Sequence, residues 1–450
     1  MMSIKETRTA LQKGEISFSD LVSSFKERIK EKNKDINAVL SVFDTEVNEE
    51  GELYGAVFLV KDNIMVKGEK CTASSGMLSH YTAPFDATVI EKIKKKGGVV
   101  IGKTNLDEFA MGSSTETSVF GPTKNPLDTS RVPGGSSGGS AAAVSDSMCS
   151  VALGSDTGGS IRQPASFCGV VGMKPTYGSV SRNGLIAMSS SFDQIGPLAR
   201  TVEDAEIVFN AICGKDERDS TTVDYYAKEG EGLRIGVPKE YFVDGMDKGV
   251  REVMDSAVSK IDEVVEISLP HTDYALAAYY IITCSEVSSN MARFDGMRYG
   301  LEKERPYSKS IIEAYINNRG DYLGEEVKRR IILGTYSLSS GYYDDYYLQA
   351  QKVRRLVYED FEKAFKEVDL ILTPTTPCFP FVIGERVNDP LSMYLSDIFT
   401  VTVNLAGLPA ISLPCGEKNG LSVGAQLIAP RFAEKNLFKG AKMLEQLWKR

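Results

Sequence analysis

The amino-terminal part of the chain carries the hydrophobic spacing of helices. Ser3 and Glu6 form a capping-box pattern, which predicts a first helix that begins at the amino terminus. Ser17 is a cap candidate for a second helix. Behind it, three apolar residues recur at fourfold spacing: Leu21, Phe25 and Ile29. This spacing predicts an amphipathic helix whose apolar side packs on the main body.

Beyond these helices, short apolar runs alternate with helical patterns. The runs that predict strands are residues 38–43, a run that ends at Lys61, and residues 99–101, 149–153, 233–237 and 265–269. The predicted helices between and after them are a capped helix over residues 86–96, a helix that starts at 140, one over 201–214, and one over 250–261. This alternation is typical of the α/β class with a mostly open sheet.

Two further segments have a distinct composition. Residues 215–232 are polar and predict a loop, where an insertion could begin. Residues 325–367 predict a long helical region with an aromatic stripe, which we interpret as core packing. The stripe consists of Tyr342, Tyr343, Tyr346 and Tyr347.

Composition narrows the function classes. The 450 residues are 42% hydrophobic and 25% charged, which is typical of a globular chain with a large core. The net charge of −9 argues against binding nucleic acid through its phosphates. The seven cysteines are scattered and lack the paired spacing of metal sites, so we expect reduced cysteines and no metal. With no apolar signal or membrane-length segment, we expect a cytoplasmic protein, and an organelle matrix would also fit.

Residues 97–104 match the phosphate-loop pattern, in which two glycines are separated by four residues and followed by Lys103 and Thr104. The residues between the glycines include Val99, Val100 and Ile101, and such a β-branched run forms a strand rather than a loop of amides. A helix also precedes the match, where a phosphate loop follows a strand. We therefore reject nucleotide binding at this segment.

Two glycine-rich serine segments are the strongest candidates for chemistry. Residues 134–140 read Gly-Gly-Ser-Ser-Gly-Gly-Ser, and residues 156–162 read Asp-Thr-Gly-Gly-Ser-Ile-Arg. Glycine-serine runs are often linkers, but these are followed by a buried helix pattern and accompanied by a core strand. In the second segment the backbone N–H groups of Thr157, Gly158, Gly159 and Ser160 can converge on a developing oxyanion, with Ser160 as the attacking serine.

A serine nucleophile needs a base, and the sequence offers little histidine. The chain has two histidines, His80 and His271, and neither lies in a motif, so we interpret both as surface or capping residues. A lysine remains. Lys61 closes an apolar run, and burial there would lower its pKa from about 10.4 toward the neutral form that a base requires.

Residues 55–197 resemble the amidase signature family, and the match rests on the two serine segments and the lysine. The resemblance implies a Ser-Ser-Lys triad of Lys61, Ser136 and Ser160. Ser160 would form the acyl enzyme, Ser136 would relay its proton, and Lys61 would act as base and then as acid. It also implies a cis peptide bond before Ser136.

The resemblance further implies the architecture. The expected fold is an α/β/α sandwich around a large mixed, mostly parallel sheet. It would form one domain over residues 1–450, with amino-terminal helices at about 3–32 packed on a catalytic core at about 55–200.

Within the family the chain is most similar to the glutamine-hydrolysing subunits of tRNA-dependent amidotransferases, at residues 105–113, 132–133 and 404–409. That similarity implies a grip on glutamine by Tyr279, Arg330 and Asp397. An arginine fork suits the α-carboxylate and an aspartate suits the α-ammonium. Apart from the resemblance, Arg330 and Asp397 would be interpreted as ordinary residues of solvated faces.

The same similarity implies partners. The chain would supply ammonia for converting Glu-tRNA(Gln) to Gln-tRNA(Gln) together with a B-type subunit and a small C-type subunit. It would hold no cofactor itself, and ATP, magnesium and the tRNA would bind mainly through the partner. Two alternatives stay open: a stand-alone amidase that needs no partner, and a non-catalytic scaffold in which Ser160→Ala would change no activity.

Overall fold

The computed structural model describes residues 2–44, 50–225, 232–242, 245–299 and 310–449. Within them, 11 strands form one sheet in the order β1-β3-β2-β4-β6-β5-β10-β11-β9-β7-β8. The strands are β1 (Val39–Val42), β2 (Val57–Lys61), β3 (Val99–Thr104), β4 (Val151–Asp156), β5 (Val171–Lys174), β6 (Gln194–Ala199), β7 (Ile235–Pro238), β8 (Val264–Ile267), β9 (Leu370–Pro374), β10 (Ala410–Lys418) and β11 (Leu421–Ile428). The α/β class expected from the alternation is confirmed.

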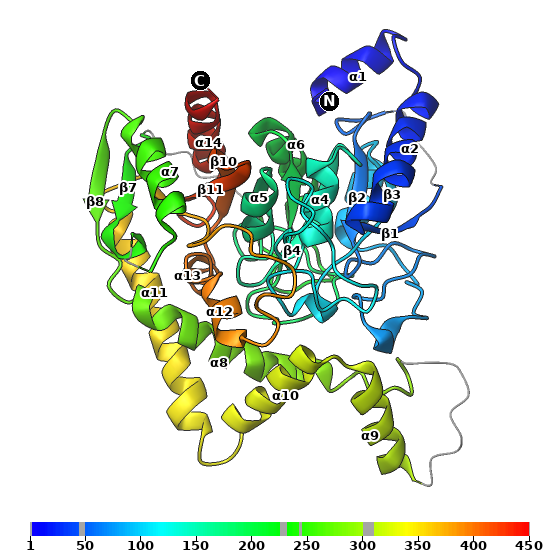
Figure 1. The fold of residues 1–450 in the computed structure, drawn as a ribbon, viewed down its shortest axis with the longest axis vertical. Helices are drawn as coiled ribbons and strands as arrows, with labels where there is room; N and C mark the ends of the chain where they lie inside the picture. Colours follow the sequence, from blue (N-terminus) through cyan, green and yellow to red (C-terminus); the bar gives the residue numbers. More distant parts are fainter. Residues whose placement is uncertain (1, 45–49, 226–231, 243–244, 300–309, 450) are drawn as a thin grey trace.

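Helices cover both faces of this sheet. Strand β2 shows why, because its side chains point alternately to two cores and all are buried. Val57 and Leu59 face α2 (Phe18–Ile36), α4 (Gly138–Ser145) and α5 (Arg162–Cys168). Phe58 and Val60 face the core that includes α3 (Thr88–Lys95), α6 (Val202–Ile212) and α14 (Glu434–Trp448). The result is a layered α/β/α structure (Figure 1).

The sheet is mixed, but its pairing differs from the mostly parallel sheet expected. Four neighbouring pairs are parallel and six are antiparallel. The parallel pairs lie on both sides of β2 and of β7. The remaining strands pair antiparallel, and β10 and β11 are joined by a tight turn, which a parallel pair cannot use.

The amino-terminal predictions are confirmed. Helix α1 (Ile4–Gln12) starts with the complete capping box of Ser3 and Glu6, and α2 starts at Ser17, whose hydroxyl accepts from the Asp20 amide at 3.0 Å. The prediction of a capped helix from Asp86 was wrong in its start. Helix α3 begins at Thr88 with no side-chain cap, because Asp86 accepts instead from the Lys67 amide and from Lys94.

The region of residues 272–406 carries mainly helices, several of which lie below the sheet in Figure 1. They are α8 (Thr272–Met291), α9 (Ile311–Tyr322), α10 (Glu325–Ser337), the π-helical η4 (Tyr343–Leu348), α11 (Gln349–Ala364), α12 (Pro390–Leu395) and α13 (Val401–Ala406). Helix α7 (Lys248–Ser259) and the short 3-10 turns η1 (Gly76–Leu78), η2 (Glu108–Ala110) and η3 (Lys239–Tyr241) complete the elements. Of the loop predicted at 215–232, residues 226–231 lie outside the described residues.

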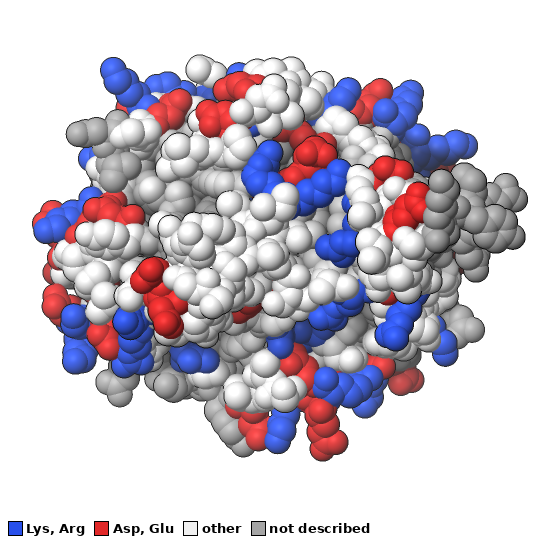
Figure 2. Space-filling view, turned by 90° about the horizontal axis from the view of Figure 1, so that it is seen from below, with Lys and Arg blue, Asp and Glu red and all other residues white. Residues whose placement is uncertain are grey.

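The aromatic stripe was wrongly assigned to the core. Tyr342, Tyr343 and Tyr346 are each 40 to 41% exposed, because the predicted long helix is interrupted after Ser337 and the chain turns. Only Tyr347 packs partly against the core. Figure 2, which looks at the molecule from below, shows a broad zone without charged side chains that is bordered by lysines, arginines and acidic residues.

The phosphate-loop match is a strand, as predicted. Residues 99–104 form β3, and Lys103 is buried with its ammonium 3.3 Å from Asp62 and donating to the Ile64 carbonyl. Every helix in the described part of the chain is too short or too polar to span a bilayer.

Candidate active site

The predicted catalytic residues meet at one edge of the sheet. Lys61 is the last residue of β2, and β4 runs parallel beside it, so the turn after Asp156 leaves the sheet at the same edge. Ser136 lies just before α4, whose helix packs on these strands. Carboxyl ends of parallel strands are where open α/β sheets place their ligands.

Lys61 is completely buried and its Nζ contacts three oxygens. These are Ser136 Oγ at 2.7 Å, Ser137 Oγ at 2.8 Å and the Ser155 carbonyl at 3.2 Å. A neutral amine has two hydrogens and one lone pair. If the hydrogens go to Ser137 and to the Ser155 carbonyl, the lone pair is left for the Ser136 hydroxyl, which is the arrangement a base needs.

Burial lowers the pKa of Lys61 to about 7, although the buried carboxylates Asp107, Asp156 and Asp193 act in the opposite direction. Desolvation penalises the ammonium form, and the three aspartates prevent a deeper shift. A large share of Lys61 is therefore unprotonated near neutral pH, as a general base requires.

The peptide bond between Gly135 and Ser136 is cis. The Ser136 carbonyl accepts from the Asp107 amide at 3.3 Å, and Asp107 accepts from the amides of Ser114 and Thr115. A side chain on Gly135 would collide with the Asp107 carboxylate. Asp107 therefore shapes the segment that carries Ser136.

Ser160 is held near this pair through the backbone. The Ser137 amide donates to the Ser160 carbonyl at 3.1 Å, and Ser160 is 9% exposed whereas Ser136 and Lys61 are fully buried. Within the described residues, no hydrogen bond joins the Ser160 hydroxyl to Ser136. The structure thus brings Lys61 and Ser136 into contact and leaves Ser160 as the most exposed of the three predicted catalytic residues.

The turn of residues 157–160 needs its glycines. Gly158 lies against the hydroxyl of Tyr279, so a Cβ there would collide with the ring, and Gly159 has φ +141°, a region that favours glycine. The Gly159 amide donates to Asp156 Oδ1 at 2.9 Å, which differs from the expectation that it serves the oxyanion. The remaining candidate donors to the oxyanion are the amides of Thr157, Gly158 and Ser160.

The Asp156 carboxylate fixes the conformation of this turn. Its carboxylate accepts from Arg162 Nε at 3.0 Å and from Asn404 Nδ2 at 2.9 Å. Burial alone would raise the pKa of Asp156, but the Arg162 guanidinium lowers it to about 2. Asp156 and Arg162 stand at the two ends of the second serine segment, so the sequence contained this ion pair without showing its role.

Arg330 on α10 is 2% exposed, which excludes the solvated face that its charge alone would suggest. Its Nε donates to Glu326 Oε1 at 2.8 Å, one helical turn away. The guanidinium lies over two rings, Tyr280 at 5.3 Å and Tyr394 at 5.6 Å. The arginine is therefore fixed in place by an ion pair and two aromatic faces.

Asp397 precedes α13 and is 7% exposed. Its Oδ2 accepts from the Ser113 hydroxyl at 2.5 Å, while Oδ1 is buried with no hydrogen-bond partner in the described structure. Burial raises the pKa of Asp397 to about 7. A buried carboxylate oxygen without a donor is costly, and an ammonium group would satisfy it.

The residues that sequence reasoning missed surround this pair: Ser113, Tyr280, Glu326 and Tyr394. Glu326 could have been found, because an acid four residues before an arginine on a predicted helix is a standard ion pair. The others are brought in only by folding. A cavity of about 250 Å³ opens beside them and is lined in part by Ser113, Glu326 and Tyr394.

The layered fold, the buried Lys61–Ser136 pair and the glycine turn are the features expected of an amidase. The chain belongs to the amidase family, whose model matches residues 20–438.

Its similarity to individual proteins extends over nearly the whole chain. It is 52% identical to the A-type subunit of glutamyl-tRNA(Gln) amidotransferase from Persephonella marina, over 99% of this chain and 97% of that protein. It is 51% identical to the protein of the same name from Caldanaerobacter subterraneus, over 100% and 96%.

Solved structures agree. The A-type subunit of glutamyl-tRNA(Gln) amidotransferase from Thermotoga maritima matches with a TM-score of 0.84 and 44% identity, over 99% of this chain and 94% of that one. The 6-aminohexanoate cyclic dimer hydrolase matches with a TM-score of 0.86 and 25% identity, over 100% and 97%.

Proposed function

We propose that this chain is the glutaminase subunit of a glutamyl-tRNA(Gln) amidotransferase. The observation that carries the proposal is that Arg330 and Asp397 are both buried. Asp397 adjoins the glycine turn, because the Thr400 hydroxyl contacts both the Asp397 carbonyl and the Gly158 carbonyl. A fixed guanidinium suits an α-carboxylate, and the unpartnered Asp397 oxygen suits an α-ammonium. A free amino acid carries both groups, whereas a simple aliphatic amide carries neither.

The reaction then follows from the site. Ser160 Oγ attacks the glutamine side-chain carbonyl while its proton passes through Ser136 to the neutral Lys61 amine. The amides of Thr157, Gly158 and Ser160 stabilise the oxyanion. When the C–N bond breaks, the same proton returns to the leaving nitrogen and ammonia departs. Water then attacks the glutamyl ester, and glutamate is released.

The subunit role rests on the relatives, which share the full length of this chain and are named as A-type subunits of that amidotransferase. We propose a B-type partner and a small C-type partner, with ATP, magnesium and the tRNA bound mainly by the partner. The chain's net charge of −9 gives it little attraction for phosphates. Its broad uncharged face offers surface for a partner to bury (Figure 2). Such a complex would work in the cytoplasm or an organelle matrix.

A stand-alone amidase is the second candidate, because the cyclic dimer hydrolase shares the fold with a TM-score of 0.86. A scaffold without chemistry is disfavoured by the Lys61–Ser136 contact and by the lowered pKa of Lys61. Substrate choice distinguishes the glutaminase subunit from the stand-alone amidase, since an amidase for other amides would not depend on Arg330 and Asp397.

Trapping the acyl enzyme tests the proposal. Incubation with glutamine and rapid acid quenching should add the mass of a glutamyl group to the peptide that contains Ser160. Lys61→Ala should fold normally yet lose at least about 10²–10⁴-fold of turnover, because the base is gone. A label on another peptide, or turnover by Lys61→Ala within a few-fold of wild type, would overturn the assignment of nucleophile and base.

A further inference from the structure

The connection between β5 and β6 touches the glycine turn of residues 157–160, here called the oxyanion turn, through Asp193. This residue is 3% exposed, and its Oδ1 accepts from the Thr157 hydroxyl at 2.7 Å. The same carboxylate accepts from the Met188 amide at 2.9 Å and from the Ser189 amide at 3.0 Å. Thr157 is thus tied to a carboxylate that is itself fixed by two backbone donors.

The same end of this connection also touches α8, the helix that carries Tyr279. We call residues 186–193 the coupling segment. Within it, the Phe192 ring lies 5.6 Å from the Tyr279 ring. Glu286, on the same helix α8, accepts from the Ser189 hydroxyl at 2.6 Å and from the Ser191 amide at 2.9 Å. The segment therefore joins α8 to the oxyanion turn.

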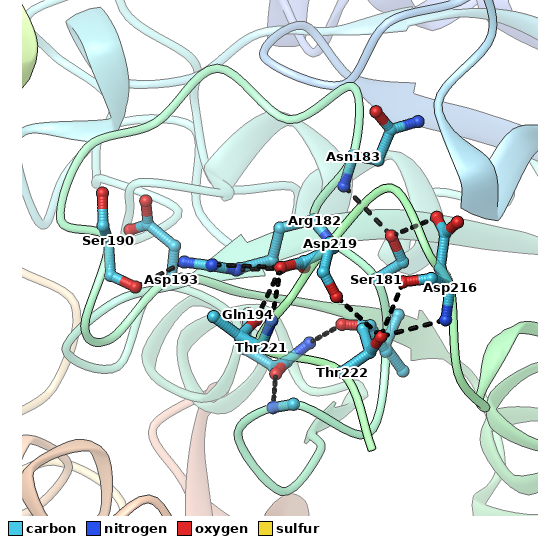
Figure 3. Close-up of polar contacts among 12 residues, drawn as sticks. Ser181, Arg182, Asn183, Ser190, Asp193, Gln194, Asp216, Asp219, Thr221 and Thr222 are labelled. Atoms are coloured by element: carbon cyan, nitrogen blue, oxygen red, sulfur yellow. Dashed lines mark hydrogen bonds and ion pairs between the residues drawn. The ribbon is translucent and has the colours of Figure 1, made fainter. Parts of the chain in front are cut away.

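A polar cluster around Arg182 contacts the coupling segment at Ser190. Figure 3 shows Arg182 close to Ser190 and Asp219. The guanidinium donates to the Ser190 carbonyl and is paired with Asp219 at 3.3 Å, and the Tyr177 hydroxyl donates to the same carbonyl at 2.7 Å. These contacts fix the backbone of the coupling segment at Ser190.

We propose that Asp193 is a positioning residue for amide hydrolysis: by holding the Thr157 hydroxyl, it aims the Thr157 amide at the developing oxyanion. The inference rests on the proposed function only for the identity of the substrate. Gly158 and Gly159 have no side chains through which the turn could be anchored, so the first residue of the turn carries that role. The other anchors act elsewhere, Thr400 on the Gly158 carbonyl and Asp156 on the Gly159 amide.

The magnitude follows from known oxyanion sites. Deleting a donor outright costs about 10²–10³ in kcat. If the Thr157 side chain is no longer held, its amide remains in the chain but is less well aimed. The loss of kcat should then be smaller, about tenfold, because the donor is misplaced rather than removed. Glutamine binding by Arg330 and Asp397 is not touched, so the effect belongs in kcat and not in KM.

The test is Thr157→Val, which removes the hydroxyl while keeping the shape of the side chain. We expect kcat for glutamine to fall about tenfold with KM changed less than about twofold. Thr157→Ser, which keeps a hydroxyl for Asp193, should restore most of the lost kcat. The matched control is Thr221→Val, which removes a hydrogen bond of the same 2.7 Å length to Asp219 in the neighbouring cluster.

A second readout is independent of glutamine. The rate at which a fluorophosphonate labels Ser160 depends on the same amides, because the serine oxygen bonds to phosphorus, fluoride leaves, and the phosphoryl oxygen gains charge. Thr157→Val should slow this labelling by a similar factor. If wild type is labelled but does not hydrolyse glutamine, the proposed function fails while the inference about Asp193 is still tested.

Asp193→Ala completes a double-mutant cycle. If the two side chains act as a pair, adding Thr157→Val to Asp193→Ala should cost no further kcat. Should Asp193→Ala fail to fold, as judged by its melting curve, Thr157→Val and Thr157→Ser still decide the question. The inference is overturned if Thr157→Val keeps kcat and labelling within twofold of wild type, if Thr157→Ser loses as much as Thr157→Val, or if the two substitutions are additive.

Discussion

At the scale of single residues, the proposed site depends on two groups whose pKa values are shifted toward 7 by burial. Lys61 must be unprotonated to act as a base, and burial lowers its pKa to about 7. Asp397 must be ionised to hold an ammonium group, and burial raises its pKa to about 7. Acid should disable both groups, because protonation removes the free amine of Lys61 and the negative charge of Asp397.

The pH profile should show this. Below about pH 7 the free enzyme gains a proton on Lys61 and another on Asp397, so log kcat/KM for glutamine should fall with a slope steeper than one. In the bound complex the substrate ammonium keeps Asp397 ionised, and kcat should fall with a slope near one. Asp397→Asn should reduce the slope of kcat/KM to one. A rate that is flat from about pH 5 to 9 would contradict the lysine base.

Arg330 and Asp397 should govern KM. Replacing either by alanine removes a charged hydrogen-bonding partner of the substrate, worth about 1.5–3 kcal/mol, and should raise KM for glutamine about 10- to 100-fold. Steady-state kinetics measures the change. Arg355→Ala is the matched control, since Arg355 forms an i,i+4 ion pair with Glu359 at 2.7 Å but is exposed. Unchanged KM in Arg330→Ala would favour the stand-alone amidase.

At the scale of elements, the turn between β4 and α5 places Ser160, the proposed nucleophile. Asp156 ends the strand, Arg162 begins the helix, and their ion pair at 2.9 Å clamps the residues between them, which include Ser160. Thr400, which precedes α13, adds a contact by donating to the Gly158 carbonyl at 2.6 Å. The shape of this turn is therefore set by side chains at its two ends and by Thr400, which is distant in the sequence.

Gly159→Ala should disrupt that shape. Its φ of +141° is unfavourable for alanine, and the added Cβ would collide with Thr400. We expect a loss of about 1–3 kcal/mol in unfolding free energy and about a 100-fold loss of kcat. Urea unfolding and glutamine hydrolysis measure the two effects. Gly320→Ala on α9 has open space around it and should leave both nearly unchanged.

At the scale of the whole molecule, the proposed function depends on association with partner subunits. A glutaminase that works for a distant active site should be weak when alone, because free hydrolysis wastes glutamine. The exposed tyrosines Tyr336, Tyr342, Tyr343 and Tyr346 belong to a surface that an isolated protein seldom displays without a partner.

Reconstitution tests this dependence. The purified chain should hydrolyse glutamine slowly, and addition of the B-type and C-type subunits with ATP, magnesium and Glu-tRNA(Gln) should raise hydrolysis and yield Gln-tRNA(Gln). Ser160→Ala in the same complex should bind the partners but deliver no ammonia. A chain that hydrolyses unrelated amides rapidly and gains nothing from the partners would contradict the subunit role and leave the Ser-Ser-Lys chemistry in place.

The sequence by itself determined the local features of this protein. The caps at Ser3 and Ser17, the strand ending at Lys61 and the glycine turn before Ser160 follow from residue type and spacing over a few positions. The α/β class follows from the alternation of two hydrophobic periods. Short-range steric and hydrogen-bonding rules are enough for these features.

Tertiary structure decided what depends on residues far apart in the chain. The antiparallel pairings, the interruption that exposes the tyrosine stripe, the use of the Gly159 amide by Asp156 and the contact of Thr157 with Asp193 all follow from long-range packing. Tertiary packing likewise decided that Arg330 and Asp397 lie in the interior rather than on solvated faces. A charge has the same sequence signal in both environments, and only the fold determines its dielectric surroundings and its partners.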